Sequence, residues 1–162
     1  MFDITRRGSF RSLLGASVVA AALAFSAGIA NAGECPANQI SAGALTSGAT
    51  APVDVSDKLL ASIDLGKEKT ALKDHLFRIR QLEIKPGGVV PWHSHAERPA
   101  LIYVVKGEIV EYASNCKVPI VHKAGDVSTE KAGVAHWWKN VSNETVVLIS
   151  SDILRDHSDR NM

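Results

Sequence analysis

From residue 75 onward, short apolar runs alternate with turns along the chain. The runs are rich in Val, Ile, Leu and Phe, and they end at clusters of Gly, Pro, Asn, Ser or Asp. Short β-forming runs separated at even spacing by turn residues are typical of a β-sandwich or barrel. The pattern predicts strands over residues 75–85, 89–95, 100–106, 108–112, 118–122, 127–130, 134–140 and 145–151.

The stretch before residue 75 lacks this pattern. Residues 33–54 are rich in Gly, Ala, Ser and Thr, and they predict an extended arm. Within the next segment, Ser56 to Ile63 is compatible with one or two helical turns capped by Ser56. We therefore expect an N-terminal arm over 33–74, a barrel over 75–151 and a loose polar tail over 152–162.

The first 32 residues predict an export signal. Basic residues precede an uncharged run rich in Ala, residues 13–29, and Ala30-Asn31-Ala32 fits a small-residue cleavage site. The pair Arg6-Arg7 resembles a twin-arginine signal, although Phe10 follows Arg7 by three residues instead of two, so the general secretory route stays the alternative. Either route predicts a periplasmic or extracellular protein that begins at Gly33 and has no membrane segment after cleavage.

Charge is balanced along the chain. The whole sequence has 18 Lys and Arg and 17 Asp and Glu. The leader holds three of the arginines and one aspartate, which leaves 15 basic and 16 acidic side chains, a net charge of −1, in the mature chain. Without a basic patch or a charge run, we expect neither nucleic acid nor an anionic membrane as a partner.

Cys35 and Cys116 are the two cysteines of the sequence, and both lie in the part predicted to be exported. In an oxidising compartment, such a pair predicts a disulfide, here between the arm and the middle of the barrel. The alternative is a pair of reduced thiols with one serving as a metal ligand. The distance of both from the histidine pair described next, and the lack of a C-x-x-C motif, argue against that alternative.

Two histidines two residues apart, His93 and His95, follow the β-branched pair at 89–90. Side chains in a strand alternate between faces, so both imidazoles project from the same face. Neighbouring imidazoles on a rigid element predict a transition-metal site. His136, on a later predicted strand, is the third candidate ligand. The other histidines, His75, His122 and His157, are interpreted as surface or strand residues and receive no role.

These residues lie in two motifs that resemble those of the cupins. Gly87, five residues, His93-x-His95 and the later Gly107 are similar to the first motif. Residues 125–140 are similar to the second, G-x5-P-x-G-x2-H-x3-N, except that Lys131 replaces the proline. The resemblance covers about residues 77–151. It implies an all-β fold, a single cupin-type barrel of the jelly-roll or double-stranded β-helix kind. Because cupins are often dimers, the resemblance also implies a homodimer.

The first motif departs from the cupin pattern at one position. Cupins usually carry a metal-binding Glu where this chain has Ala100. Either the site has three histidines, as in some cupin dioxygenases that act on diketones, thiols or aromatic acids, or Glu97, two residues after His95, replaces the missing ligand. Because Pro99 disturbs the alternation of the strand, we favour three histidines, with Glu97 as an optional ligand or outer neighbour.

The sequence thus predicts an exported metal-binding cupin that binds or acts on a small molecule, anionic or dicarbonyl. The cofactor is a divalent transition metal, and Fe, Mn, Zn, Ni and Cu are not distinguished. For substrate, Arg98 is a candidate carboxylate ligand, with a surface salt bridge as its alternative reading, and Gln81 and Tyr103 are candidate cavity residues. Catalysis stays open: a dioxygenase-like enzyme and a non-catalytic periplasmic binding module are both compatible with the motifs.

Overall fold

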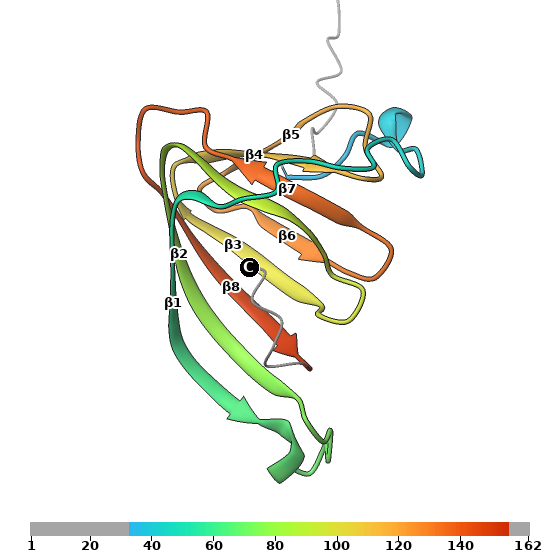
Figure 1. Ribbon diagram of the computed structural model, residues 1–162, viewed down its shortest axis with the longest axis vertical. Coiled ribbons are helices and arrows are strands. Elements are labelled where there is room, and N and C mark those ends of the chain that lie inside the picture. Colours follow the sequence, from blue (N-terminus) through green and yellow to red (C-terminus); the bar gives the residue numbers. More distant parts are fainter. Residues whose placement is uncertain (1–32, 156–162) are drawn as a thin grey trace, which may run out of the picture.

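The computed structural model describes residues 33–155, which form an all-β fold (Figure 1). Its strands are β1 (Val53–Asp64), β2 (Leu76–Ser94), β3 (Ala100–Lys106), β4 (Glu108–Ala113), β5 (Ile120–Lys123), β6 (Val127–Glu130), β7 (Ala135–Lys139) and β8 (Val146–Leu154). Two short 3-10 turns, η1 (Ala37–Gln39) and η2 (Leu65–Lys67), accompany them. The antiparallel order β5-β4-β7-β2-β8-β3-β6, with β1 added beside β2, makes a nearly closed barrel. The predicted fold class is confirmed.

Strand β2 is the element that positions the histidine pair. The sequence predicted two strands separated by a turn at Pro86-Gly87-Gly88, but the chain runs on as one strand and only bends there. Gly87 has a φ of 77°, and a Cβ on Gly88 would lie 2.7 Å from a methyl carbon of Ile84. The bend therefore needs glycine at both positions. Before the bend β2 pairs with β8, and after it β2 pairs with β7, which carries His136.

Strand β1 corrects the helical turns predicted from Ser56 to Ile63. The whole segment is extended and pairs antiparallel with β2, from Val53 opposite Val89 to Asp64 opposite Leu76. Local helix propensity is weak, and the backbone hydrogen bonds that β2 offers outweigh it. In Figure 1, β1 and the first part of β2 project below the rest of the barrel.

Alternating side chains of the barrel strands form the main core. Ile84, Ile109, Val146 and Val104 are almost completely buried. The full buried cluster comprises Leu82, Ile84, Val90, Val104, Ile109, Trp138, Val146 and Leu148. These side chains lie on the same face of their strands as the histidines, so the core and the candidate site share the barrel interior.

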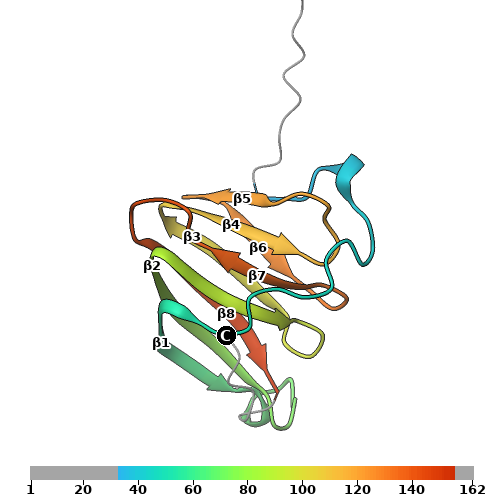
Figure 2. The ribbon, with the colours of Figure 1, turned by 45° about the horizontal axis from the view of Figure 1, so that its top comes forward.

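The predicted disulfide between Cys35 and Cys116 is present, with the two Cα atoms 5.8 Å apart. A β-bridge between Ile40 and Cys116 adds a backbone contact between the arm and the barrel next to the disulfide. Beyond η1 the arm, blue to cyan in Figure 2, crosses the outside of the barrel to β1, and the Ala49 carbonyl accepts a hydrogen bond from the Trp92 amide at 2.7 Å. The arm is therefore attached to the barrel at two places.

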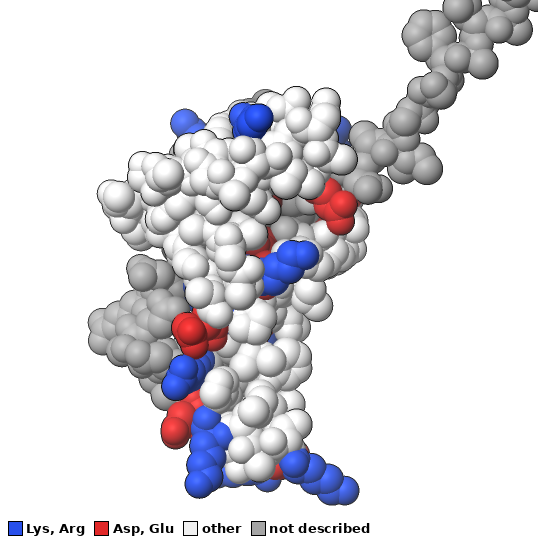
Figure 3. Space-filling model, turned by 90° about the vertical axis from the view of Figure 1, so that its right-hand side faces the viewer, with Lys and Arg blue, Asp and Glu red and all other residues white. Residues whose placement is uncertain are grey.

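The C-terminal boundary lies later than predicted. Strand β8 continues through Asp152 to Leu154, and Asp152 is 1% exposed, so the tail expected from residue 152 is strand for its first three residues. On the face in Figure 3, charged side chains of both signs gather near the end where β1 and β2 project. Within residues 33–155, no helix has the length and apolar character of a membrane span.

Candidate functional site

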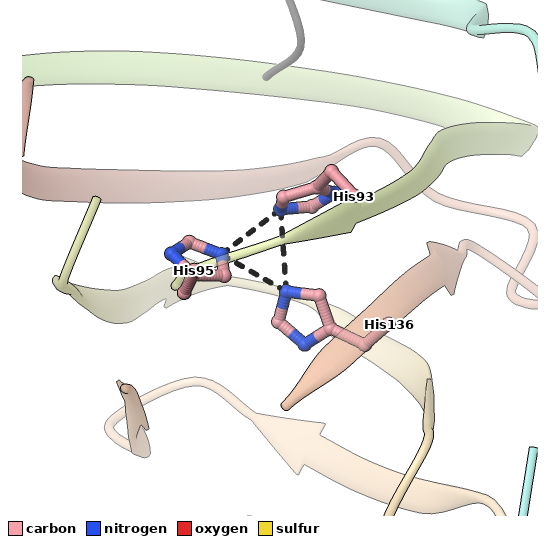
Figure 4. Close-up of side chains that lie close together, drawn as sticks. All are labelled: His93, His95 and His136. Carbon is pink, nitrogen blue, oxygen red and sulfur yellow. Dashed lines mark hydrogen bonds between the residues drawn. The ribbon is translucent and has the colours of Figure 1, made fainter. Parts of the chain in front are cut away.

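Three histidines meet inside the barrel, carried by two neighbouring strands (Figure 4). His93 lies near the end of β2, His95 follows directly after it, and His136 is on β7. His93 and His136 are cross-strand partners in the ladder between β2 and β7. All three are buried, with exposed fractions of 9%, 4% and 1% for His93, His95 and His136. The strand bend and the β2–β7 register together bring these residues to one point.

Their Nε2 atoms form a nearly equilateral triangle. The separations are 3.0 Å between His93 and His95, 3.1 Å between His95 and His136, and 3.2 Å between His136 and His93. Imidazole nitrogens bound to one ion at about 2.1 Å lie about 3.0 Å apart at right angles and about 3.4 Å apart at tetrahedral angles. The triangle fits a single transition-metal ion in either geometry.

The other ring nitrogens fix the tautomers. The Nδ1–H of His93 donates to the Pro91 carbonyl at 2.8 Å, and that of His95 donates to the Arg98 carbonyl at 2.7 Å. A carbonyl oxygen only accepts, so the proton of each ring sits on Nδ1 and the Nε2 lone pair points to the centre. Outward Nδ1–H bonds of this kind are how metal-binding histidines are usually oriented.

Burial keeps two of the rings neutral. Loss of hydration, reinforced by the neighbouring His136, lowers the pKa of His93 from 6.5 to about 2 and that of His95 to about 4. Burial also acts on His136, but its hydrogen bond to Glu111 and the charge of Glu130 raise its pKa overall. Neutral imidazole is the form that binds metal, so His93 and His95 are ready ligands at neutral pH.

A carboxylate supports His136 from behind, on the side of the ring away from the triangle. Glu111, on β4, accepts from His136 Nδ1 at 2.6 Å and from His122 Nε2 at 2.8 Å. A second carboxylate oxygen, from Glu130 on β6, lies 3.3 Å from the same Nδ1. Although burial opposes it, hydrogen bonding from both rings lowers the pKa of Glu111 to about 2. Glu111 therefore stays charged between two histidines.

The sequence interpretation missed this group. His122, read as a surface or strand residue without a role, is fully buried on β5 and hydrogen-bonded to Glu111. A usable signal was present, because Glu111 stands between Ile109 and Ala113 in the apolar phase of its strand. A charged residue in that phase must face the interior, where it needs a partner.

Replacing Glu111 by Gln is expected to weaken metal binding by roughly 10- to 100-fold while the barrel still folds, because outer partners of this kind orient the ligand and raise its basicity. Competition with a chromophoric chelator measures the dissociation constant. Glu108→Gln is the matched control: it lies on the same strand, but its carboxylate is partly exposed and pairs with Lys123. Equal affinities for the Glu111 variant and the control would contradict the role of Glu111.

A small cavity of about 30 Å³ opens in front of the three histidines. Its walls are apolar, and its polar groups are the histidines, an arginine and a serine. The lining residues are Arg80, Leu82, Val90, His93, His95, Ile102, His136, Trp138, Leu148 and Ser150. A ligand here would meet metal-binding imidazoles and one guanidinium within a largely apolar enclosure.

Around Asp152 lies an arginine cluster, defined as Arg78, Arg80 and Arg98. Arg78 makes two hydrogen bonds to the Asp152 carboxylate, at 2.9 and 2.7 Å. Arg80 donates to it at 3.1 Å, and the guanidinium of Arg98 lies 3.7 Å away. Asp57, on β1, also pairs with Arg80. The carboxylate of Asp152 is completely buried, so it needs these partners.

Four further residues named from the sequence fall in other places. Glu97 is turned outward, with its side chain 76% exposed and paired with Arg155 at 3.1 Å, so the structure does not bring it to the histidines. Arg98 is buried in the arginine cluster and does not line the cavity. Gln81 and Tyr103 point to the outer face: Gln81 donates to Glu83 on that face, and Tyr103 is 46% exposed. The strand alternation gives their neighbours Arg80 and Ile102 the inward positions.

Comparisons with known proteins agree with this architecture. The family model described as "Cupin domain" matches residues 80–152, and no curated protein matches the chain. Among solved structures, a predicted oxalate decarboxylase from Thermotoga maritima has 22% identity and a TM-score of 0.51, covering 65% of this chain and 92% of its own. KdgF from Halomonas sp. has 16% identity and a TM-score of 0.48, covering 65% and 83%. The family match over residues 80–152 therefore identifies the barrel of this chain as a cupin domain.

Proposed function

We propose that this protein is an exported metal-binding cupin that holds a divalent transition metal with His93, His95 and His136 and binds or acts on a small anionic molecule in the barrel. The observation that carries the proposal is the triangle of Nε2 atoms, 3.0 to 3.2 Å apart. When the three rings are neutral, their Nε2 lone pairs point at one place, and a cation among them relieves the repulsion. His93 and His95 are also held in the tautomer that a metal requires, and Glu111 accepts from Nδ1 of His136.

A bound metal of this kind supplies Lewis acidity and open positions for a small ligand. The protein supplies the rest of the site. The two strands hold the imidazoles in place, Glu111 fixes His136, and the walls formed by Leu82, Val90 and Ile102 exclude water from the ligand. Glu97 is remote from this point, so the proposed site has three protein ligands.

Two roles remain for such a site: a metal-dependent enzyme of the dioxygenase type and a non-catalytic periplasmic module that holds a metal or small ligand. Within the described residues, no carboxylate lines the cavity as a candidate general base. The fold is used by both classes of protein, so the fold does not decide between them.

Metal analysis of protein purified from the exported fraction of the source cell tests the proposal. We expect close to one equivalent of a divalent transition metal per chain, and a metal-free protein that binds none on titration would contradict it. Oxygen uptake with a panel of diketones, thiols and hydroxy-aromatic acids then separates the roles. Turnover of any member assigns an enzyme, and metal-loaded protein without turnover supports the binding module.

Export is supported by the Cys35–Cys116 disulfide, since such bonds persist in oxidising compartments. The leader itself, with its cleavage site after Ala32, lies outside the described residues. An intact mass of the exported protein that begins at Gly33 tests this part of the proposal. A mass that retains the leader would contradict cleavage.

The homodimer also stays a prediction. It is supported by exposed apolar side chains on the projecting part of the molecule, which include Leu59, Ile63 and Phe77, each between 44% and 54% exposed. Among the described strands, β1 pairs on one side only, with β2, and an open edge of this length is a site for pairing with another chain. A monomeric mass in sedimentation would contradict the dimer.

A further inference from the structure

The cavity lining combines polar and apolar side chains. The three imidazoles, Arg80 and Ser150 are its polar groups, whereas the remaining lining side chains are aliphatic or, at Trp138, aromatic. A volume of about 30 Å³ leaves room for only a few heavy atoms. The shape and polarity therefore fit a compact molecule with a single strongly polar group.

Arg80 has a donor that the protein does not use. Its NH1 pairs with Asp57, and its NH2 donates to Ser150 at 3.2 Å and to Asp152 at 3.1 Å. Its Nε–H is buried and has no hydrogen-bond partner among the described residues. A buried donor without an acceptor is costly, and a ligand oxygen would relieve that cost. The Ser150 hydroxyl accepts from Arg80, which leaves its own proton for the same ligand.

The charges of the interior favour an anion. The arginine cluster contributes three positive charges, and nearby carboxylates contribute four negative ones when all are ionised: Asp57, Asp152, Glu111 and Glu130. Burial raises the pKa of Glu130, so four negative charges is the upper limit. A divalent cation on the three histidines adds two, so at least one positive charge remains. Arginine cannot shed its proton to remove this excess. One negative charge on the ligand would balance it.

We propose that Arg80 and Ser150 form the anion-binding part of the cavity and that the ligand is a short-chain monocarboxylate. Its carboxylate lies within reach of the Arg80 Nε–H and the Ser150 hydroxyl, which are neighbours in the cavity lining. Its short apolar chain lies against the aliphatic wall. This inference rests on the proposed metal site for its charge balance, whereas the free Nε–H is a property of the chain alone. The inference assigns to Arg80 the carboxylate-binding role that the sequence suggested for Arg98.

Acetate and its uncharged counterpart acetamide are the probes. Both are titrated into metal-loaded protein while tryptophan fluorescence is followed, since Trp138 lines the cavity, and the metal content of each sample is measured separately. We expect acetate to bind at least tenfold more tightly than acetamide. Arg80→Lys, which keeps the charge and loses the Nε–H, should weaken acetate binding at least tenfold. Arg78→Lys is the matched control, from the same cluster but outside the cavity lining, and should bind acetate as the wild type does.

Ser150→Ala covers the case in which the Arg80 variant does not fold. It removes the second donor and no charge, and it should weaken acetate binding several-fold with metal content unchanged. Equal binding of acetate and acetamide, or unchanged acetate binding in the folded Arg80 or Ser150 variant, would overturn the inference. A wild type that holds no metal contradicts the proposed function instead, and the same titration of the metal-free protein still tests Arg80 through its free Nε–H.

Discussion

Replacing His136 by Ala is expected to remove most of the bound metal. The imidazoles of His93 and His95 remain, and β7 no longer contributes a ligand. The variant also leaves Glu111 and Glu130 without the ring between them, so some loss of stability accompanies the loss of metal. Metal content after dialysis, measured on protein with a native circular dichroism spectrum, checks the expectation.

Two further variants make this result specific. His93→Ala removes a ligand whose Nδ1 donates to the Pro91 carbonyl, and it should lose metal to a similar degree without disturbing the carboxylates. His75→Ala removes a histidine outside the site, whose Nδ1 donates to the Lys73 carbonyl, and it should keep its metal. Full metal retention by the His136 and His93 variants would exclude a three-histidine site.

Removing the disulfide is expected to lower the free energy of unfolding by roughly 4 kcal/mol and the melting temperature by roughly 15 °C. The size of the effect follows from the loop that the bond closes, since Cys35 and Cys116 are separated by 81 residues. The change is a Cys35→Ser, Cys116→Ala double variant, with Ala at the position that is 5% exposed. Urea unfolding followed by fluorescence measures the difference.

Wild-type protein unfolded with and without a reducing agent is the control for that comparison. Reduction should reproduce the loss seen in the double variant, whereas the variant itself should not respond to the reductant. A difference below 1 kcal/mol between oxidised and reduced wild type would show that the arm stays attached without the bond. The Ile40 bridge and the Ala49 hydrogen bond would then be sufficient to hold it.

The alternation of apolar and turn residues was enough to predict the barrel, because each inward position of a half-buried strand must be apolar. It failed at β1, where most side chains are exposed and leave no pattern to read. It also failed at Pro86-Gly87-Gly88, where residues typical of a turn bend a strand that continues. In both places the pairing partner, which is distant in sequence, decides the local structure.

The histidines could be named from their spacing, but their surroundings could not. His93 and His95 share a face by strand geometry alone, whereas Glu111 reaches His136 through the pairing of β4 with β7. The same limitation explains Arg80 and Arg98. Arg98 follows the histidines in sequence and attracted the carboxylate-binding role, but Arg80 on the earlier part of β2 lines the cavity. These residues meet because their strands lie side by side in the barrel, and not because they are close together in the sequence.

The separate locations of the disulfide and the histidines bear on the order in which the protein matures. The ligands come from β2 and β7, whereas the bond joins the arm to the loop between β4 and β5. Assembly of the proposed metal site would thus consume no oxidising equivalent, and a chain that folds under reducing conditions would already present all three imidazoles. Metal insertion and cross-linking would then be separable in time and place. A folded, metal-loaded precursor is compatible with the twin-arginine route, and oxidation of Cys35 and Cys116 would then be the final step that closes the arm over the barrel.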